Sequence, residues 1–310
     1  DGEALYQQFE LKKRRESANW LMKILFLKIP LGCPDNFLRS TYHYAKPLFS
    51  RSFFIVWMIA LLMAIGIVVA RWDAFTSDLA SVLAIQNLPA ILLVMAVLKL
   101  WHELGHGYAC RHYGVSVPNA GLLFMIGTPL AFVDATGSWS LPKRSQRQVI
   151  NLAGIYFEMM IAIVAAFVWV FSSNASIQSL AHFTLLVSSV TTIGFNFNPL
   201  MKYDGYFVLA DLLGIPNLRG RAATATAALS KRLFLGIHSP NEQSLWLRTI
   251  LVSYGICAAI YKWFLVIAIS TMLAMQVWIV GILVGGYYFL SSVGTTIWQT
   301  VKYLLLSEEL

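Results

Sequence analysis

Residues 53–70 read FFIVWMIALLMAIGIVVA, a stretch without a charged side chain that is followed at once by Arg71. About 20 such residues in a helix cross the hydrocarbon core of a bilayer. The whole chain of 310 residues has the same character, because 58% of them are hydrophobic and 12% are charged, against roughly 25% charged in an average soluble domain. This composition excludes a soluble enzyme and a disordered chain, and it predicts an all-α polytopic membrane protein.

Five other stretches are apolar and long enough to cross a bilayer, which brings the predicted transmembrane helices to about six. They cover residues 83–110, 149–171, 180–201, 249–275 and 277–301. A further apolar segment, 119–139, contains residues that interrupt a helix. Those residues are Gly127, Pro129, Asp134 and Gly137. The interruptions favour a re-entrant or membrane-lying segment, which is tolerated only where protein covers the backbone.

Lysine and arginine predict the orientation, because cytoplasmic loops carry an excess of positive charge. Nine of these residues precede the first predicted span: Lys12, Lys13, Arg14, Arg15, Lys23, Lys28, Arg39, Lys46 and Arg51. The loop after that span holds Arg71 beside Asp73 and Asp78, so the N-terminus is expected to be cytoplasmic. Residues 20–30 mix basic and apolar side chains as an interfacial helix does. No aromatic platform lies between the basic residues, so the net charge of +8 does not indicate nucleic acid as a partner.

The span at 83–110 ends in the motif His102-Glu103-Leu104-Gly105-His106. Two histidines four apart project from one face of a helix, so both imidazoles can reach one zinc ion. Zinc lowers the pKa of a water molecule toward 7, and Glu103 is placed to accept its proton, which creates a nucleophile for a peptide carbonyl. Ionisable groups in a membrane are costly, which favours this reading over polar residues that merely lie at the interface.

A catalytic zinc site usually has three protein ligands and one open position, so a third ligand is required. His112 has the spacing of the third histidine in soluble metzincins, but Ala109 stands where that motif has a glycine. Asp204 lies between Pro199 and Gly205 in a region where the helix is interrupted, which frees backbone groups that a buried cavity must satisfy. The predicted topology puts Asp204 at the depth of the two motif histidines, so it is the favoured candidate.

At these residues the chain resembles the site-2 protease family of intramembrane zinc metalloproteases. That family has a histidine–glutamate motif on one core span and, two core spans later, an asparagine followed by proline three on and by aspartate-glycine eight on. The positions with this spacing are Asn196, Pro199, Asp204 and Gly205. The resemblance implies a core of three transmembrane helices and the zinc ligands His102, His106 and Asp204. It also implies Glu103 as the general base and Asn196 as a catalytic residue that positions substrate or stabilises the oxyanion.

Within that family the chain is most similar to the bacterial branch of peptide zinc metalloproteases. The residues that carry this similarity are 99–114, 129–138, 153–158 and 198–206. Members of the branch often continue into a periplasmic adaptor-like region, so that region or other complex subunits are expected partners. The further partners expected are a membrane-protein or peptide substrate and the lipid bilayer. The branch implies an integral protein of the bacterial inner membrane.

The predicted organisation has three parts. Residues 1–52 form a cytoplasmic or interfacial segment, and residues 53–301 form the transmembrane metalloprotease domain, with its catalytic core at about 83–212. Residues 302–310 are expected to be a tail that continues in a longer protein.

One position departs from the family pattern. Many members have an asparagine in the middle core span where this chain has Glu158, on the helical face of Asn151 and Gly154. Glu158 is expected to point into the bundle, either as a protonated or Lys202-paired residue that packs helices, or as a residue that binds substrate or acts in catalysis. It is also a competitor of Asp204 for the metal.

Other polar and small residues have open roles. Asn198, Lys202 and Asp134 are candidates for substrate or accessory contacts, with Asp134 expected to order the re-entrant segment. Lys262 falls in the middle of a span, so it is expected to face a cavity or a carboxylate, or to mark a break that brings it to the interface. Gly281 and Gly285 are four apart and predict close approach of another helix, most simply within the chain.

The predicted function is that of a zinc metalloendopeptidase which hydrolyses peptide bonds in or near a membrane segment through zinc-activated water. The alternative is a non-proteolytic zinc-binding membrane scaffold of a larger export or assembly complex, which the departure at Glu158 leaves open. A transporter would be expected to show internal repeats, and the sequence has none.

Overall fold

The computed structural model describes residues 26–77, 87–125, 128–235, 244–276, 278–279, 281–291 and 294. The chain divides into two compact units, residues 1–214 and 215–310. The first unit contains both predicted site motifs, so the site can be described within it. Each unit is described by itself.

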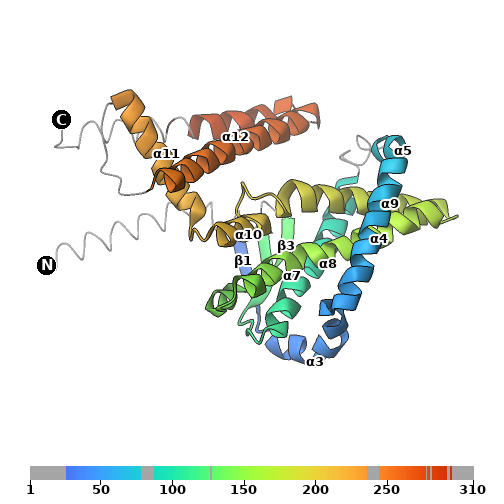
Figure 1. Cartoon of the computed structure of the whole chain (residues 1–310). Coiled ribbons are helices and arrows are strands. Elements are labelled where there is room, and N and C mark those ends of the chain that lie inside the picture. The colour runs from blue at the N-terminus through green and yellow to red at the C-terminus, as the bar shows by residue number, and fades with distance from the viewer. Residues whose placement is uncertain are drawn as a thin grey trace. The chain divides into compact units, whose positions relative to one another are not determined.

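Long apolar helices dominate the first unit (Figure 1). They are α4 (Arg51–Ala70), α7 (Leu88–His112), α8 (Arg144–Phe171) and α9 (Ala175–Ser189), which continues as the π-helix η4 (Val190–Asn196). The shorter helices are α3 (Asp35–Ala45), η1 (Lys46–Phe49), α5 (Trp72–Thr76), η3 (Thr136–Ser140) and α10 (Asp204–Leu213).

Five helices in the described part of the chain are long and apolar enough to cross a membrane, so the expectation of an all-α polytopic membrane protein is confirmed. Four belong to the first unit, and the fifth is α12 (Leu245–Gln276) in the second. The sixth predicted span, 277–301, lies partly outside the described residues. Its described part contains the shorter apolar helix Gly281–Ser291.

The helix predicted at 180–201 stops earlier than expected. The helical conformation ends at Asn196, and the chain turns before α10 begins. Asn198 accepts a hydrogen bond from the backbone N–H of Leu200 at 2.8 Å, and Pro199 has no N–H to continue a helix. This turn separates Asn196 from Asp204, and α10 then packs against α8.

A small antiparallel sheet accompanies the helices. Its strands are β1 (Phe26–Gly32), β2 (Ala120–Met125) and β3 (Thr128–Val133), in the order β1-β2-β3. The segment predicted to be re-entrant or membrane-lying, 119–139, thus contains a β-hairpin followed by η3, while the predicted helix-interrupting residue Gly127 lies outside the described residues. The interfacial helix predicted at 20–30 is wrong for Phe26–Pro30, where β1 pairs with β2. Short apolar runs suit either conformation, and here a distant strand supplies the hydrogen bonds.

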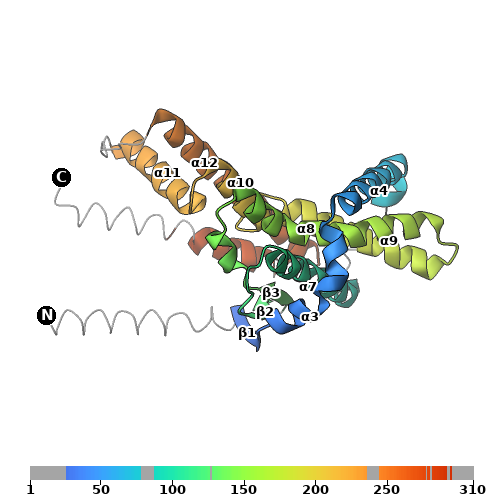
Figure 2. The same ribbon diagram turned by 60° about the horizontal axis from the view of Figure 1, so that its bottom comes forward.

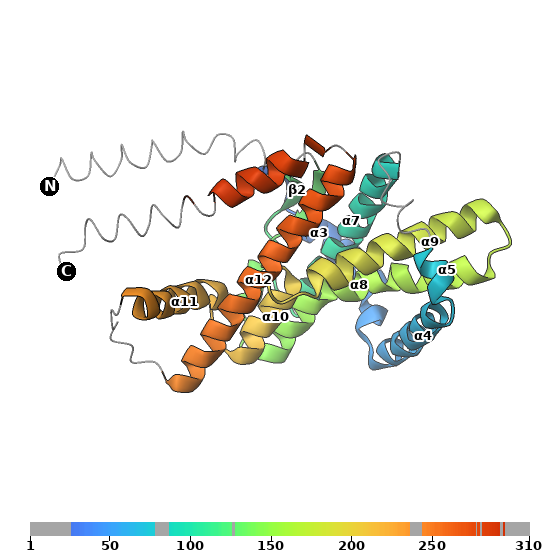
Figure 3. The ribbon, with the colours of Figure 1, turned by 90° about the horizontal axis from the view of Figure 1, so that it is seen from above.

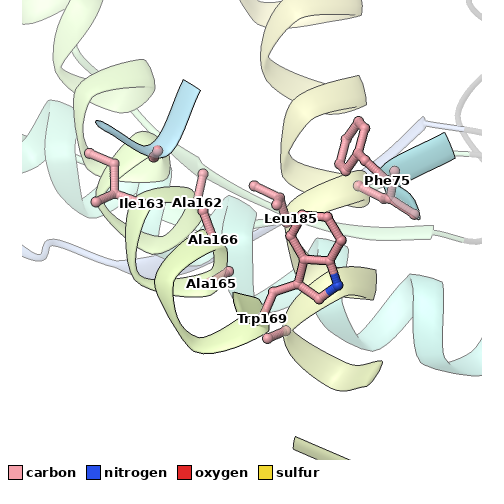
Figure 4. Packing of buried hydrophobic residues seen from close by; sticks show 10 residues of the cluster. Phe75, Ala162, Ile163, Ala165, Ala166, Trp169 and Leu185 are labelled. Carbon is pink, nitrogen blue, oxygen red and sulfur yellow. The ribbon is translucent and has the colours of Figure 1, made fainter. Parts of the chain in front are cut away.

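Helix α8 is the centre of the first unit and packs against α7, α9, α4 and α10 (Figures 1 and 3). Its contact with α9 is built from small residues beside one large ring: Ala162, Ala166 and Trp169 face Leu185 (Figure 4). Small residues let two helix backbones approach closely, which is how helices associate in lipid. Figure 2 shows the sheet and α3 on the side of α7, which the hairpin contacts through β3.

The second unit contains α11 (Leu218–Leu235), α12 and the helix Gly281–Ser291. A Cβ on Gly281 would lie 2.5 Å from the backbone nitrogen of Ala274, so this glycine serves close packing within the chain, as expected. The Lys262 ammonium lies over the ring of Tyr288, 4.9 Å from its centroid, and no ion pair joins it to a carboxylate of the described residues. The aromatic face stabilises the charge that the sequence placed in the middle of a span.

Candidate metal centre

The two motif histidines and Asp204 converge between α7 and α10. His102 and His106 are both buried, and their Nε2 atoms are 3.1 Å apart. Asp204, the first residue of α10, places Oδ2 2.9 Å from Nε2 of His102 and Oδ1 3.5 Å from Nε2 of His106. Among the described residues, these three form a group whose ligand atoms all lie within 4.8 Å of one another.

The space beside the two histidines exists because position 154 on α8 is a glycine. A Cβ there would lie 2.3 Å from Nε2 of His102 and 2.5 Å from Nε2 of His106. Any larger side chain would occupy the space that the two nitrogens face.

The opposite nitrogens of both imidazoles are held by α8. Nδ1 of His106 lies 2.7 Å from the backbone oxygen of Ile150, which can only accept a hydrogen bond. Nδ1 of His102 lies 2.9 Å from Oε2 of Glu158. Donation from both Nδ1 atoms leaves the Nε2 lone pairs directed at each other and at Asp204, an arrangement that a cation relieves.

Glu158 is fully buried and is the centre of a polar network. Besides His102, it accepts hydrogen bonds from the Nδ2 amide of Asn196, at 2.8 Å, and from the Thr191 hydroxyl. Lys99 lies 3.9 Å from the same carboxylate and donates to Oδ1 of Asn196 at 2.8 Å. Glu158 therefore holds Nδ1 of the candidate ligand His102, on the side of the ring away from the metal site. The cationic partner of Glu158 is Lys99, not the predicted Lys202.

Glu103 is held by the sheet. Its Oε2 accepts a hydrogen bond from the backbone N–H of Val133, the last residue of β3, at 2.9 Å. A cavity of about 260 Å³ adjoins the glutamate and is lined by α7 and by residues of the sheet. The hairpin thus fixes one carboxylate oxygen beside the metal-ligand cluster.

The remaining predicted residues lie outside this cluster. Asn198 forms the turn before α10, and Lys202 is exposed. Asp134 accepts hydrogen bonds from the backbone and hydroxyl of Thr136, in the chain that follows β3. His112 pairs with the Tyr42 hydroxyl at 2.7 Å and stacks on Phe49, so it does not approach the other two histidines.

Sequence reasoning missed two members of the network, Lys99 and Thr191. Lys99 had a usable signal, because it is a charged residue within a span and lies three residues before His102, on the same helical face. Thr191 had none, since a hydroxyl in a span commonly bonds to the preceding turn, as this one also does with Ser188.

Comparison with known proteins agrees with this geometry. The sequence model of Peptidase family M50 matches residues 90–307, which is more than half of the chain and includes both motifs. No curated protein and no solved structure showed significant similarity. The extent of the match is decisive: the chain belongs to peptidase family M50, the site-2 protease family of membrane metalloproteases.

Proposed function

We propose that this protein is a zinc metalloendopeptidase that hydrolyses peptide bonds in or near a membrane segment. The observation that carries the proposal is the convergence of His102, His106 and Asp204 beside Glu103, with Gly154 leaving the space open. Three nitrogen and oxygen donors match the ligand set of catalytic zinc, which keeps a further position for water or substrate.

The charges of the cluster also fit a divalent cation. Three carboxylates lie in or beside it, those of Glu103, Glu158 and Asp204, and Lys99 supplies a single ammonium. A doubly charged ion would bring these groups to neutrality, which matters where water is scarce and an unbalanced charge is expensive. Asp204 Oδ2 is buried, lies 2.9 Å from Nε2 of His102 and has no hydrogen-bond partner among the described residues, as expected of a ligand atom.

When bound, zinc would lower the pKa of water toward 7 and polarise the substrate carbonyl. Glu103 accepts the proton of the attacking water and afterwards donates it to the leaving amine nitrogen. The Val133 N–H holds Oε2, so the proton is carried on Oε1. Asn196 donates one amide hydrogen to Glu158 and has a second to offer the carbonyl oxygen of a substrate.

The proposal extends to the membrane location of the site and to the substrate and partner proteins. The positive loops support a cytoplasmic N-terminus and a site near the cytoplasmic face of a bacterial inner membrane. The substrate is then a membrane protein or a peptide whose cleaved segment is unwound. A periplasmic adaptor-like region or other subunits complete the complex.

Metal content and cleavage in purified protein test the proposal. We expect about one zinc ion per chain, and Glu103→Gln should keep the metal but abolish hydrolysis of a membrane-segment peptide substrate. Asp204→Ala should lose zinc, whereas His112→Ala, the matched control at the other candidate ligand, should keep it. Full activity of Glu103→Gln would refute the mechanism, and zinc retained without cleavage of any membrane-segment substrate would favour the non-proteolytic scaffold.

A further inference from the structure

One face of α8 holds two of the three candidate metal ligands. Arg147, Ile150, Gly154 and Glu158 recur at intervals of three or four residues, so they share a face of the helix. The backbone oxygen of Ile150 receives one histidine, Glu158 receives the other, and Gly154 leaves room between them. The remaining member of this face, Arg147, has no contact with either histidine, so its role is open.

The third ligand needs another kind of support. Asp204 is the first residue of α10 and follows a non-helical stretch, and no side chain caps this end of the helix at Tyr203. The position of its carboxylate therefore depends on how α10 as a whole is held. Asp211 lies seven residues later in the same helix, about two turns away, and so on nearly the same face.

Arg147 reaches Asp211 from α8. Its Nε and Nη2 groups donate to Oδ1 of Asp211 at 3.1 and 2.6 Å, and Asp211 is 5% exposed. The guanidinium is itself fixed, because Nη1 donates to the backbone oxygen of Leu141 at 2.7 Å and Cζ lies over the Trp139 ring, 6.0 Å from its centroid. A planar guanidinium held on several sides makes a stiff connection between two helices.

We propose that the Arg147–Asp211 ion pair positions Asp204 as the third zinc ligand, so that one face of α8 sets the geometry of all three. The proposal rests on the proposed function for the identity of the ion. Seven residues of helix span about 10 Å, so a tilt of about 5° at Asp211 displaces Asp204 by about 1 Å. Functional constellations tolerate about 0.5 Å. Arg147 and Asp211 are thus positioning residues that act through α10.

The test uses a double variant, because removing one partner would leave a buried charge unpaired and destabilise the fold. Arg147→Met/Asp211→Leu removes both charges together. We expect it to fold and to bind zinc about tenfold or more weakly in chelator competition, the range seen when residues behind metal ligands are changed. In metal-free protein, hydrogen–deuterium exchange in α10 should rise while α7 and α9 stay unchanged. Lys143→Met is the matched control, since Lys143 is exposed at the same end of α8.

Wild-type zinc affinity and wild-type exchange in the double variant would overturn the proposal. Arg147→Lys provides a second measurement should the double variant not fold, because lysine keeps the positive charge but loses the several N–H donors of the guanidinium. We expect this variant to have an intermediate zinc affinity. Wild-type zinc affinity together with wild-type exchange in Arg147→Lys would equally overturn the proposal. Wild-type protein that takes up no zinc would refute the proposed function, while the exchange comparison would still decide whether the ion pair holds α10.

Discussion

The substitution Gly154→Ala tests the candidate metal site most directly, because it adds one methyl group at a known place. The new Cβ would lie 2.3 Å from Nε2 of His102 and 2.5 Å from Nε2 of His106. Zinc binds imidazole nitrogen at about 2.0–2.1 Å, so methyl group and ion compete for the space beside the two nitrogens. To avoid the overlap with the new methyl group, the two imidazole rings must turn away from Ile150 and Glu158, or α8 must move away from α7.

The magnitude follows from the overlap. Inserting a methyl group into a packed site costs about 1–3 kcal/mol, and each 1.4 kcal/mol is a factor of ten in a binding constant. If the apo protein relaxes and metal binding must restore the ring positions, zinc affinity should fall by about 5- to 150-fold. The backbone of α8 tolerates alanine, so the helical content should not change.

The assay is zinc competition against a chelator of known affinity in detergent, with circular dichroism and thermal unfolding on the same samples. Gly66→Ala is the matched control, because a Cβ at Gly66 in α4 meets nothing within 4 Å. Gly66→Ala should bind zinc like the wild type. Unchanged zinc affinity in Gly154→Ala would show that the ion does not bind between these two histidines, and the reasoning would fail.

Two further predictions concern the surroundings of the site. Lys99→Met should destabilise the protein and weaken zinc binding, because it leaves the buried Glu158 carboxylate without its cationic partner. Adding Glu158→Gln should restore much of the stability but not the zinc affinity. Thermal unfolding and chelator competition measure the two effects, and additive losses of stability would contradict the coupling between the two residues. Gly121→Ala would place a Cβ 2.2 Å from the backbone oxygen of Ile29, so the sheet must shift, and Val133 with it. Peptide cleavage should fall while zinc content stays constant. Full activity would show that the Val133 N–H is not needed to hold Glu103.

Much of the helical fold could be predicted because it depends on local patterns. Long, mainly apolar runs mark α4, α8 and α12, because a helix satisfies its own backbone hydrogen bonds in lipid. The sheet could not be predicted in the same way. Its strand β1 pairs with β2 across about ninety residues, and a short apolar run does not reveal whether such a partner exists.

In the candidate site, too, only the residues that are close in sequence could be placed together from the sequence. His102 and His106 are four residues apart on one helix, so their common orientation follows from helix periodicity alone, and Glu103 is necessarily close to both. Asp204 was predicted through depth and family resemblance, and its distance from the histidines became known only from the fold. Lys202 was the cation suggested for Glu158, whereas the fold gives Lys99 that place.

By itself, the sequence determined that this protein spans a membrane and that two histidines and a glutamate share one helix, because composition and helical spacing are local properties. The tertiary structure alone decided what surrounds them. Lys99 meets Asn196 across 97 residues, His102 meets Glu158 across 56, and Asn196 meets Glu158 across 38. Such contacts arise from the packing of α7, α8 and η4 on one another, and no single segment contains the information that sets their distance.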